Sequence, residues 1–206
     1  MEITLAAAPP VILASKSAAR AQLLRAAGVP FTQAEALVDE AAAREALQAE
    51  AVPVEEAAIA LAGLKAAFVA RQAPEPAIVV GADQLLELEG AWLEKPKDAA
   101  AARAQLAALR GRRHRLVSGV VAFRGNSRIW QHVDVARLWV RNCSDAFLDR
   151  YVAAAGPDIL ACVGAYQLEG LGAQLMARVE GDWFTILGLP LLPLLQFLRD
   201  QGVLLR

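Results

Sequence analysis

The chain has few of the residues that mark disulfide-bonded or metal-binding proteins. Of its 206 residues, two are cysteines, Cys143 and Cys162, and two are histidines, His114 and His132. The cysteines form neither a CxxC pair nor a disulfide framework, and the histidines are too far apart in the sequence for a metal-binding motif. We therefore expect buried, reduced cysteines and histidines that are ordinary polar residues of strands.

An excess of charge of one sign is also missing, since 21 Lys and Arg stand against 22 Asp and Glu. A balanced charge does not attract a polyanion, so bulk nucleic acid is not an expected partner. No basic region precedes the apolar residues of the N-terminus, and the apolar stretch 185–198 is short and interrupted by Pro190 and Pro193. Neither segment is typical of a signal peptide or a membrane span. We expect a cytoplasmic protein with no membrane partner.

The chain also lacks a P-loop, a phosphatase nucleophile motif, internal repeats, low-complexity tracts and flexible linkers. The first two absences argue against a kinase-like protein or a phosphate-monoester phosphatase. The last three leave no visible domain boundary, and the length is ample for a sizeable core. We therefore predict a single domain over residues 1–206.

An apolar run at 11–14 is followed by a helical pattern, with a short serine-containing junction between them. The pattern predicts a buried strand, then Ser15 to Ser17 as the junction, with Ser17 as the N-cap of the helix. The hydroxyls, the first amides of the helix and the nearby Arg20 could bind an anion there. Ordinary capping is the alternative interpretation, and this stretch alone favours it.

A second apolar run begins at Ala77 and predicts a strand buried on both faces, ending at Asp83 and Gln84. A carboxylate buried at the end of a strand is costly unless a partner compensates it. Glu89 and Gly90 predict the turn of a hairpin that would return Lys95 toward Asp83. The spacing supports a simple salt bridge and a functional role equally.

The remaining pattern predicts further helices and strands. Alone, Lys65 would be a surface lysine and the pair Asp39–Glu40 a solvated helix start. The glycine-punctuated loop 164–172, which carries Glu169, would allow a ligand to approach the backbone. We predict helices at 57–68, 99–109, 145–155 and 191–199, and strands at 29–34, 114–124, 128–140, 174–180 and 183–187.

A set of short segments is spread over almost the whole chain, in this order: Leu13-Ala-Ser-Lys-Ser-Ala-Ala-Arg20, Val38-Asp-Glu40, Lys65, Gly81-Ala-Asp-Gln84, Glu94-Lys-Pro96, Gly111-Arg-Arg-His114, Gly164-Ala-Tyr166, Glu169-Gly-Leu-Gly-Ala173 and Gly188-Leu-Pro190. Together these segments resemble the Maf family of nucleoside triphosphate pyrophosphatases. The resemblance implies an α/β fold of the inosine-triphosphatase type, an elongated mixed sheet with flanking helices and a cleft between two lobes. It also implies hydrolysis of a nucleoside triphosphate to the monophosphate and pyrophosphate, with a divalent cation (Mg²⁺ or Mn²⁺), by a protein that commonly forms a homodimer.

The resemblance also assigns roles to matching positions. A triphosphate is strongly anionic, so cations must offset its charge, while one carboxylate must stay ionised to activate water. Phosphate binding falls to Ser15, Arg20, Lys65 and Lys95, metal binding to Glu40 and Asp83, and the general base to Asp83.

Three positions bear on the choice of substrate. Family members that act on thymidine and uridine triphosphates usually have Arg, Thr and Gln where this chain has Ala19, Gln84 and Glu169. The last two resemble the subgroup that hydrolyses 7-methylguanosine triphosphate, which has Trp at the position of Ala19. The resemblance therefore implies a non-standard or modified nucleoside triphosphate as substrate, with 7-methylguanosine triphosphate as one candidate.

A different class of function is the alternative. The name of the family reflects a link to septum formation, so the chain could be a nucleotide-binding regulator of cell division. A pure sensor has no need of Asp83, and the presence of that carboxylate favours the enzyme.

Overall fold

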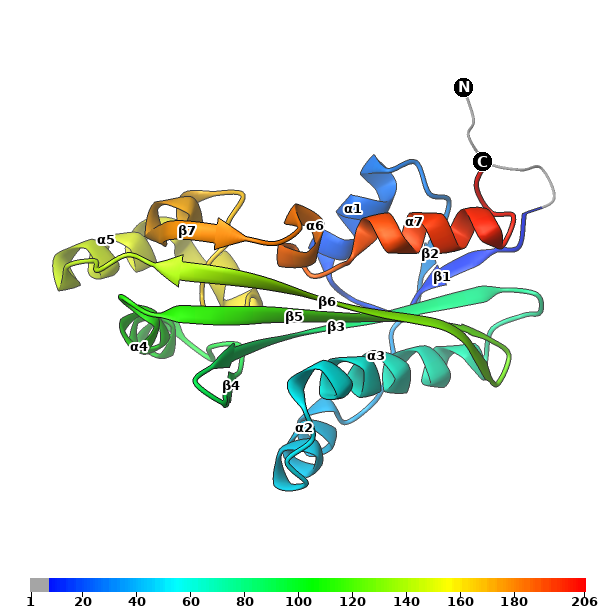
Figure 1. Cartoon of the computed structure of the whole chain (residues 1–206), viewed down its shortest axis with the longest axis horizontal. Helices are drawn as coiled ribbons and strands as arrows, with labels where there is room; N and C mark the ends of the chain where they lie inside the picture. The colour runs from blue at the N-terminus through cyan, green and yellow to red at the C-terminus, as the bar shows by residue number, and fades with distance from the viewer. Residues whose placement is uncertain (1–7) are drawn as a thin grey trace. The chain divides into compact units, whose positions relative to one another are not determined.

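The computed structural model describes residues 8–206 and shows a mixed α/β architecture (Figure 1). Seven strands form one mixed sheet in the order β2-β1-β3-β5-β6-β7, with β4 paired to β3. Helices flank the sheet, so the mixed α/β fold expected from the resemblance is confirmed. The elements are β1 (Val11–Leu13), α1 (Ala18–Ala26), β2 (Thr32–Gln33), α2 (Glu40–Ala49), α3 (Val54–Ala70), β3 (Ile78–Leu88), β4 (Ala91–Leu93), α4 (Ala99–Leu109), β5 (Arg113–Arg124), β6 (Ser127–Val140), α5 (Asp145–Ala155), η1 (Gly156–Ala161), η2 (Leu171–Leu175), β7 (Met176–Glu180), α6 (Trp183–Ile186) and α7 (Leu191–Asp200).

The chain forms two compact units, each built from separate stretches of sequence. Unit 1 comprises residues 8–84 together with Ser118–Asp134 and Trp183–Arg206. Unit 2 comprises Leu85–Val117 and Val135–Asp182. The single domain expected over residues 1–206 stays a prediction. No helix in residues 8–206 is long and apolar enough to span a membrane.

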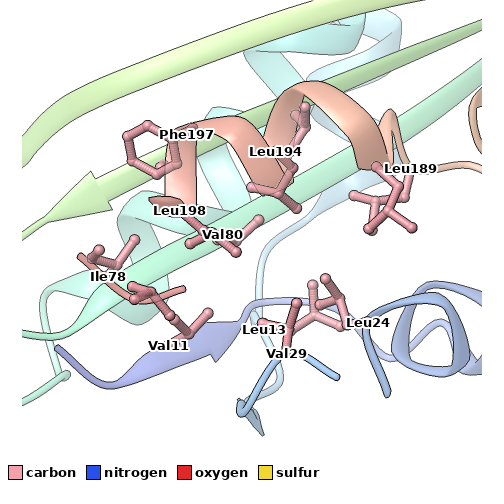
Figure 2. Packing of buried hydrophobic residues seen from close by; sticks show 14 of the residues in the cluster. Val11, Leu13, Leu24, Val29, Ile78, Val80, Leu189, Leu194, Phe197 and Leu198 are labelled. Atoms are coloured by element: carbon pink, nitrogen blue, oxygen red, sulfur yellow. The ribbon is translucent and has the colours of Figure 1, made fainter. Parts of the chain in front are cut away.

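In unit 1, the strands are covered by helices on both faces. Strand β1 runs parallel to β2 and β3, with Leu13 opposite Val80. Because side chains alternate along a strand, Val80 packs with α1 and α7, whereas Val79 packs with α3 on the other face. Figure 2 shows the first of these cores, where Leu24 of α1 and Leu194 of α7 lie over the strands.

Helix α3 touches the sheet through backbone rather than through large side chains. A Cβ atom added at Gly81 would lie 2.3 Å from the carbonyl oxygen of Ala62, and one at Gly119 would lie 2.6 Å from the carbonyl carbon of Ala58. The sheet therefore needs glycine at both points. This approach brings Lys65, on the same helix, down to the strands, where it is only 7% exposed.

In unit 2, the end of β3 turns into β4 as an antiparallel hairpin. Leu88 lies opposite Ala91 around the predicted turn at Glu89 and Gly90, so that hairpin is confirmed. Strands β6 and β7 are also antiparallel. Helices α4 and α5 are joined at the surface by Arg103, whose guanidinium lies 2.8 Å from both Asp145 and Asp149.

Three predicted elements differ from the structure. Strand β3 does not end at Asp83 and Gln84 but continues to Leu88, because both polar side chains have partners inside the protein and the apolar run resumes beyond them. Residues Trp183–Ile186 form helix α6 rather than a strand, because a stretch of only four residues is too short to show a period. Strand β2 has only two residues.

The close packing of α3 generates a test with its own control. Gly81→Ala should lower the free energy of unfolding by about 1–3 kcal/mol, because the added methyl group meets backbone atoms that cannot move aside. Gly63→Ala, on α3 with no atom within 4 Å of the new Cβ, should instead raise it by about 0.5–1 kcal/mol. Urea unfolding of both variants measures the difference. A loss of equal size in the two would contradict this packing.

Candidate active site

The centre of the candidate site is a buried lysine between two carboxylates, all in unit 1. The Nζ atom of Lys65 on α3 lies 2.7 Å from Oδ1 of Asp83 on β3 and 2.7 Å from Oε2 of Glu40 on α2. Lys65 and Asp83 are buried, whereas the side chain of Glu40 is 42% exposed. The expectation that Lys65 would be a surface lysine is therefore wrong. Its charge is retained inside the protein because two carboxylates compensate it.

The two carboxylate oxygens of Asp83 differ in their contacts. Lys65, rather than Lys95, is the ion-pair partner of Oδ1. The other oxygen, Oδ2, is buried and has no hydrogen-bond partner. A buried carboxylate oxygen without a partner is costly. Its presence therefore points to a ligand or water that donates a hydrogen bond to Oδ2, or to a cation that Oδ2 coordinates.

The same two carboxylates fit a divalent cation. Mg²⁺ prefers oxygen ligands and is commonly held by one or two carboxylates together with water and substrate phosphates. Glu40 and Asp83 provide such a pair, with Oδ2 of Asp83 free to bind. Within residues 8–206 there is no cluster of three or more His, Cys, Asp or Glu side chains that could hold a metal on its own. The remaining ligands would therefore have to come from the substrate and from water.

Arg20 links the junction after β1 to two other parts of unit 1. Its Nε donates to the carbonyl of Gly188 at 2.7 Å, and its Nη1 donates to the carbonyl of Ala82 at 2.9 Å. Burial lowers the pKa of the Arg20 guanidinium, and the negative charges of Asp83 and Glu40 act in the opposite direction. Arginine nevertheless stays protonated in proteins, so Arg20 is a fixed cation next to the two carboxylates.

The two serines of the junction do different things. Ser17 is the N-cap of α1, since its Oγ accepts from the amide of Arg20 at 3.3 Å, as predicted. The Oγ of Ser15 accepts from the amide of Ser17 at 3.2 Å and from Nη1 of Arg20 at 3.3 Å. A hydroxyl has two acceptor lone pairs and one donor hydrogen, so Ser15 can still donate to an anion. Capping and anion binding are compatible here.

Gln84 points to the opposite face of β3 from Asp83. Its Nε2 lies 3.0 Å from Oγ of Ser118, 3.0 Å from the carbonyl of Thr185 and 3.1 Å from the carbonyl of Ile186. Because the two carbonyls can only accept, they fix the orientation of the amide. The amide nitrogen of Gln84 therefore holds α6 through hydrogen bonds within the protein. This use argues against a role in which the same amide donates to a substrate base.

Ser118 and Thr185 are members of this network that the sequence did not single out. The hydroxyl of Ser118 donates to the carbonyl of Thr185 at 2.9 Å, and the hydroxyl of Thr185 donates to Oδ2 of Asp134 at 2.8 Å. Both side chains are fully buried. The signal that could have found Ser118 is a lone hydroxyl within the apolar run of the predicted strand 114–124.

The remaining candidates lie elsewhere. Ala19 is half-buried in the first turn of α1, in unit 1. Lys95 and Glu169 are both exposed and both belong to unit 2. Burial and the charge of Glu169 raise the pKa of the Cys162 thiol, while the charge of Lys95 lowers it. These two side chains therefore lie near the same part of unit 2.

Comparison with known proteins gives closely similar relatives over almost the full length. The family model described as Maf-like protein matches residues 10–201. A nucleoside triphosphate pyrophosphatase of Rhodospirillum rubrum is 51% identical over 197 residues, which cover 96% of this chain and 97% of the relative. A 7-methyl-GTP pyrophosphatase of Rhizobium meliloti is 45% identical over 196 residues, which cover 95% of this chain and 98% of the relative.

The buried ion pair predicts a large difference between two lysines. Lys65→Met leaves Asp83 buried without its counter-charge and should lower the free energy of unfolding by roughly 3–5 kcal/mol. Lys16→Met removes only an exposed pair with Glu35 and should cost about 0–1 kcal/mol. Urea unfolding near neutral pH measures both. Adding Asp83→Leu to Lys65→Met should recover part of the loss; similar small losses in both lysine variants would show that the ion pair is not buried in solution.

Proposed function

This chain belongs to the family of Maf-like proteins, and from that membership and the cluster of Glu40, Lys65 and Asp83 we propose that it hydrolyses nucleoside triphosphates. It is a nucleoside triphosphate pyrophosphatase, an enzyme that acts on acid anhydrides. Its products are the nucleoside monophosphate and pyrophosphate. The observation that carries this proposal is the buried carboxylate of Asp83, held by Lys65 through one oxygen and open at the other.

Asp83 is the proposed general base. The bond that breaks joins the α- and β-phosphates, and one water molecule is consumed. Oδ2 of Asp83 has the free lone pairs needed to orient this water and to take its proton. Lys65 fixes the carboxylate through Oδ1, so that Oδ2 keeps a defined direction toward the water.

The phosphates are the proposed ligands of the junction after β1. The hydroxyl of Ser15 has its acceptor sites occupied and a hydrogen to donate, and Arg20 adds a fixed positive charge beside it. The first amides of α1, which begins at Ala18, are further candidate donors to an anion. Lys95, in unit 2, is the further cation that the family pattern assigns to phosphate charge.

A divalent cation, Mg²⁺ or Mn²⁺, is the proposed cofactor. Glu40 and Oδ2 of Asp83 would hold it, because Oδ2 has two lone pairs and one of them can face the cation while the other accepts from the water. When bound, it would offset negative charge on the phosphate oxygens. Lys65 would keep both carboxylates in place whether or not the cation is present.

The proposed substrate carries guanine or a modified purine. At neutral pH the carboxylate of Glu169 can only accept hydrogen bonds, and guanine presents N–H donors at N1 and N2. A relative that is 45% identical to this chain is named a 7-methyl-GTP pyrophosphatase. Ala19 offers no aromatic ring for stacking, which is worth about 1–3 kcal/mol per base, so selectivity for the methylated ring should be modest. Gln84 would contribute by holding α6 rather than by donating its amide hydrogens to the base.

The alternative of a regulator of cell division is not favoured. A protein that only binds a nucleotide gains nothing from burying an ion pair that leaves one carboxylate oxygen unpartnered. We expect the enzyme to act in the cytoplasm on free nucleotides, not on bulk nucleic acid or at a membrane, and to form a homodimer.

The role of Asp83 is tested by its amide. Asp83→Asn should retain nucleotide binding and lower turnover by roughly a hundredfold or more, because an amide cannot take the proton. Asp98→Asn is the matched control: Asp98 is an exposed N-cap of α4, and asparagine caps a helix equally well. Release of pyrophosphate and of phosphate is measured separately with Mg²⁺ present. Turnover close to that of the wild type in Asp83→Asn would exclude it as the base.

Base selection is tested by Glu169→Gln. Glutamine both donates and accepts, so the ratio of kcat/KM for guanosine to uridine triphosphate should fall by roughly ten- to a hundredfold, the scale of one charged hydrogen bond. Glu89→Gln makes the same change of charge at an exposed position of unit 2 and should leave the ratio unchanged. The panel includes 7-methylguanosine and thymidine triphosphates. A wild-type preference for pyrimidines that survives the substitution would refute this assignment.

A further inference from the structure

The loop that carries Glu169 begins in a strained conformation. Gly164 and Ala165 both lie in the left-handed region, with φ angles of +81° and +58°. Alanine is disfavoured there because its Cβ crowds the following carbonyl. Such a conformation persists only where the surrounding structure imposes it. The start of this loop must therefore be held by its neighbours.

The neighbours are three aromatic side chains of unit 2. The hydroxyl of Tyr166 lies 2.7 Å from Nε2 of His114 on β5, and both residues are buried. The ring of Tyr166 also lies against Gly164, where a Cβ atom would be 2.8 Å from its Cε1. Tyr151 of α5 donates its hydroxyl to the carbonyl of Ala165 at 3.3 Å. Side chains of β5 and α5 thus anchor consecutive residues of the loop.

The pair of His114 and Tyr166 is a costly way to fill a core. Burial lowers the pKa of His114 to about 4 and raises the pKa of Tyr166, so both side chains are neutral at pH 7. Nδ1 of His114 is buried and has no hydrogen-bond partner, whichever ring nitrogen carries the proton. Two apolar side chains of the same shape would avoid this loss. The pair instead fixes an orientation, because its directional hydrogen bond sets the position of the tyrosine ring and of the backbone next to it.

The far end of the loop is fixed as well. A Cβ atom at Gly172 would lie 2.3 Å from the carbonyl oxygen of Gln167, so the chain folds back on itself there. The amide of Gly170 donates to the same carbonyl at 3.1 Å. Glu169 is exposed between the two anchored ends. Its position is therefore set by residues that lie before and after it.

We propose that His114 and Tyr166 are positioning residues for base selection, which hold residues 164–172 in the conformation that presents Glu169 to the nucleobase. This inference rests on the proposed function, since it acts through the role of Glu169. It assigns a use to two buried side chains that the chemistry on the phosphates does not involve.

The test measures selectivity and not activity alone. Tyr166→Phe keeps the ring and removes the hydroxyl, and it should lower the ratio of kcat/KM for guanosine to uridine triphosphate by about tenfold, toward the value of Glu169→Ala. His114→Leu should do the same, whereas His114→Gln, which can still bond to the tyrosine hydroxyl, should retain more of the ratio. Ser144→Ala removes the N-cap of α5 in unit 2 without touching the loop, so it should lower the melting temperature and leave the ratio intact.

Combining the variants separates this inference from the one on which it rests. Adding Tyr166→Phe to Glu169→Ala should change the ratio no further, because the tyrosine acts through the carboxylate. A ratio that falls in Glu169→Ala but not in Tyr166→Phe, or that falls additively in the double variant, overturns the positioning role alone. An equal fall in Ser144→Ala also overturns it. If Glu169→Ala leaves the ratio unchanged, base selection by Glu169 is wrong, and this inference falls with it.

Discussion

The ion pairs of the buried Lys65 ammonium group are the interaction on which the rest of unit 1 depends. A charge inside a protein is tolerated only where opposite charges lie close, and here two carboxylates lie 2.7 Å from one nitrogen. The distance can be this short because α3 meets the strands backbone to backbone at Gly81 and Gly119. Packing and electrostatics are thus not separate contributions, since a larger residue at either glycine would move the lysine away from its partners.

Strand β3 serves two networks because its side chains alternate. Asp83 faces Lys65 and Glu40, and the next residue, Gln84, faces the carbonyls of α6 on the other side. Arg20 joins the second network to the first, since it binds the carbonyls of Ala82 and Gly188 and feels the charge of both carboxylates. A single strand therefore positions the proposed base on one face of the sheet and helix α6 on the other.

Local features were predictable from the sequence, and contacts between distant segments were not. Ser17 caps α1 as predicted, and the hairpin at Glu89 and Gly90 formed as predicted, because a few neighbouring residues determine each of them. The partner of Asp83 was missed, because Lys65 lies on a helix 18 residues earlier and a lone lysine there is more often solvated. The resemblance to a family placed Lys65 at the site, which spacing alone could not do. No local pattern marks the hydrogen bond between His114 and Tyr166, which are 52 residues apart.

The order of two adjacent residues also protects the pairing of β3 with its neighbours during folding. If β3 slipped by one position against β1, every side chain would change face. A slip in one direction would bring the carboxylate of Asp83 to the carbonyl oxygens of Thr185 and Ile186, which offer it no donor. A slip in the other direction would bring the neutral amide of Gln84 to the ammonium of Lys65, which would lose one of its two carboxylate partners. Each slip leaves a buried charged group without a partner that it has in the aligned sheet. An acidic residue followed by an amide residue thus favours the correct strand alignment, because a misaligned sheet is less stable even before any nucleotide binds.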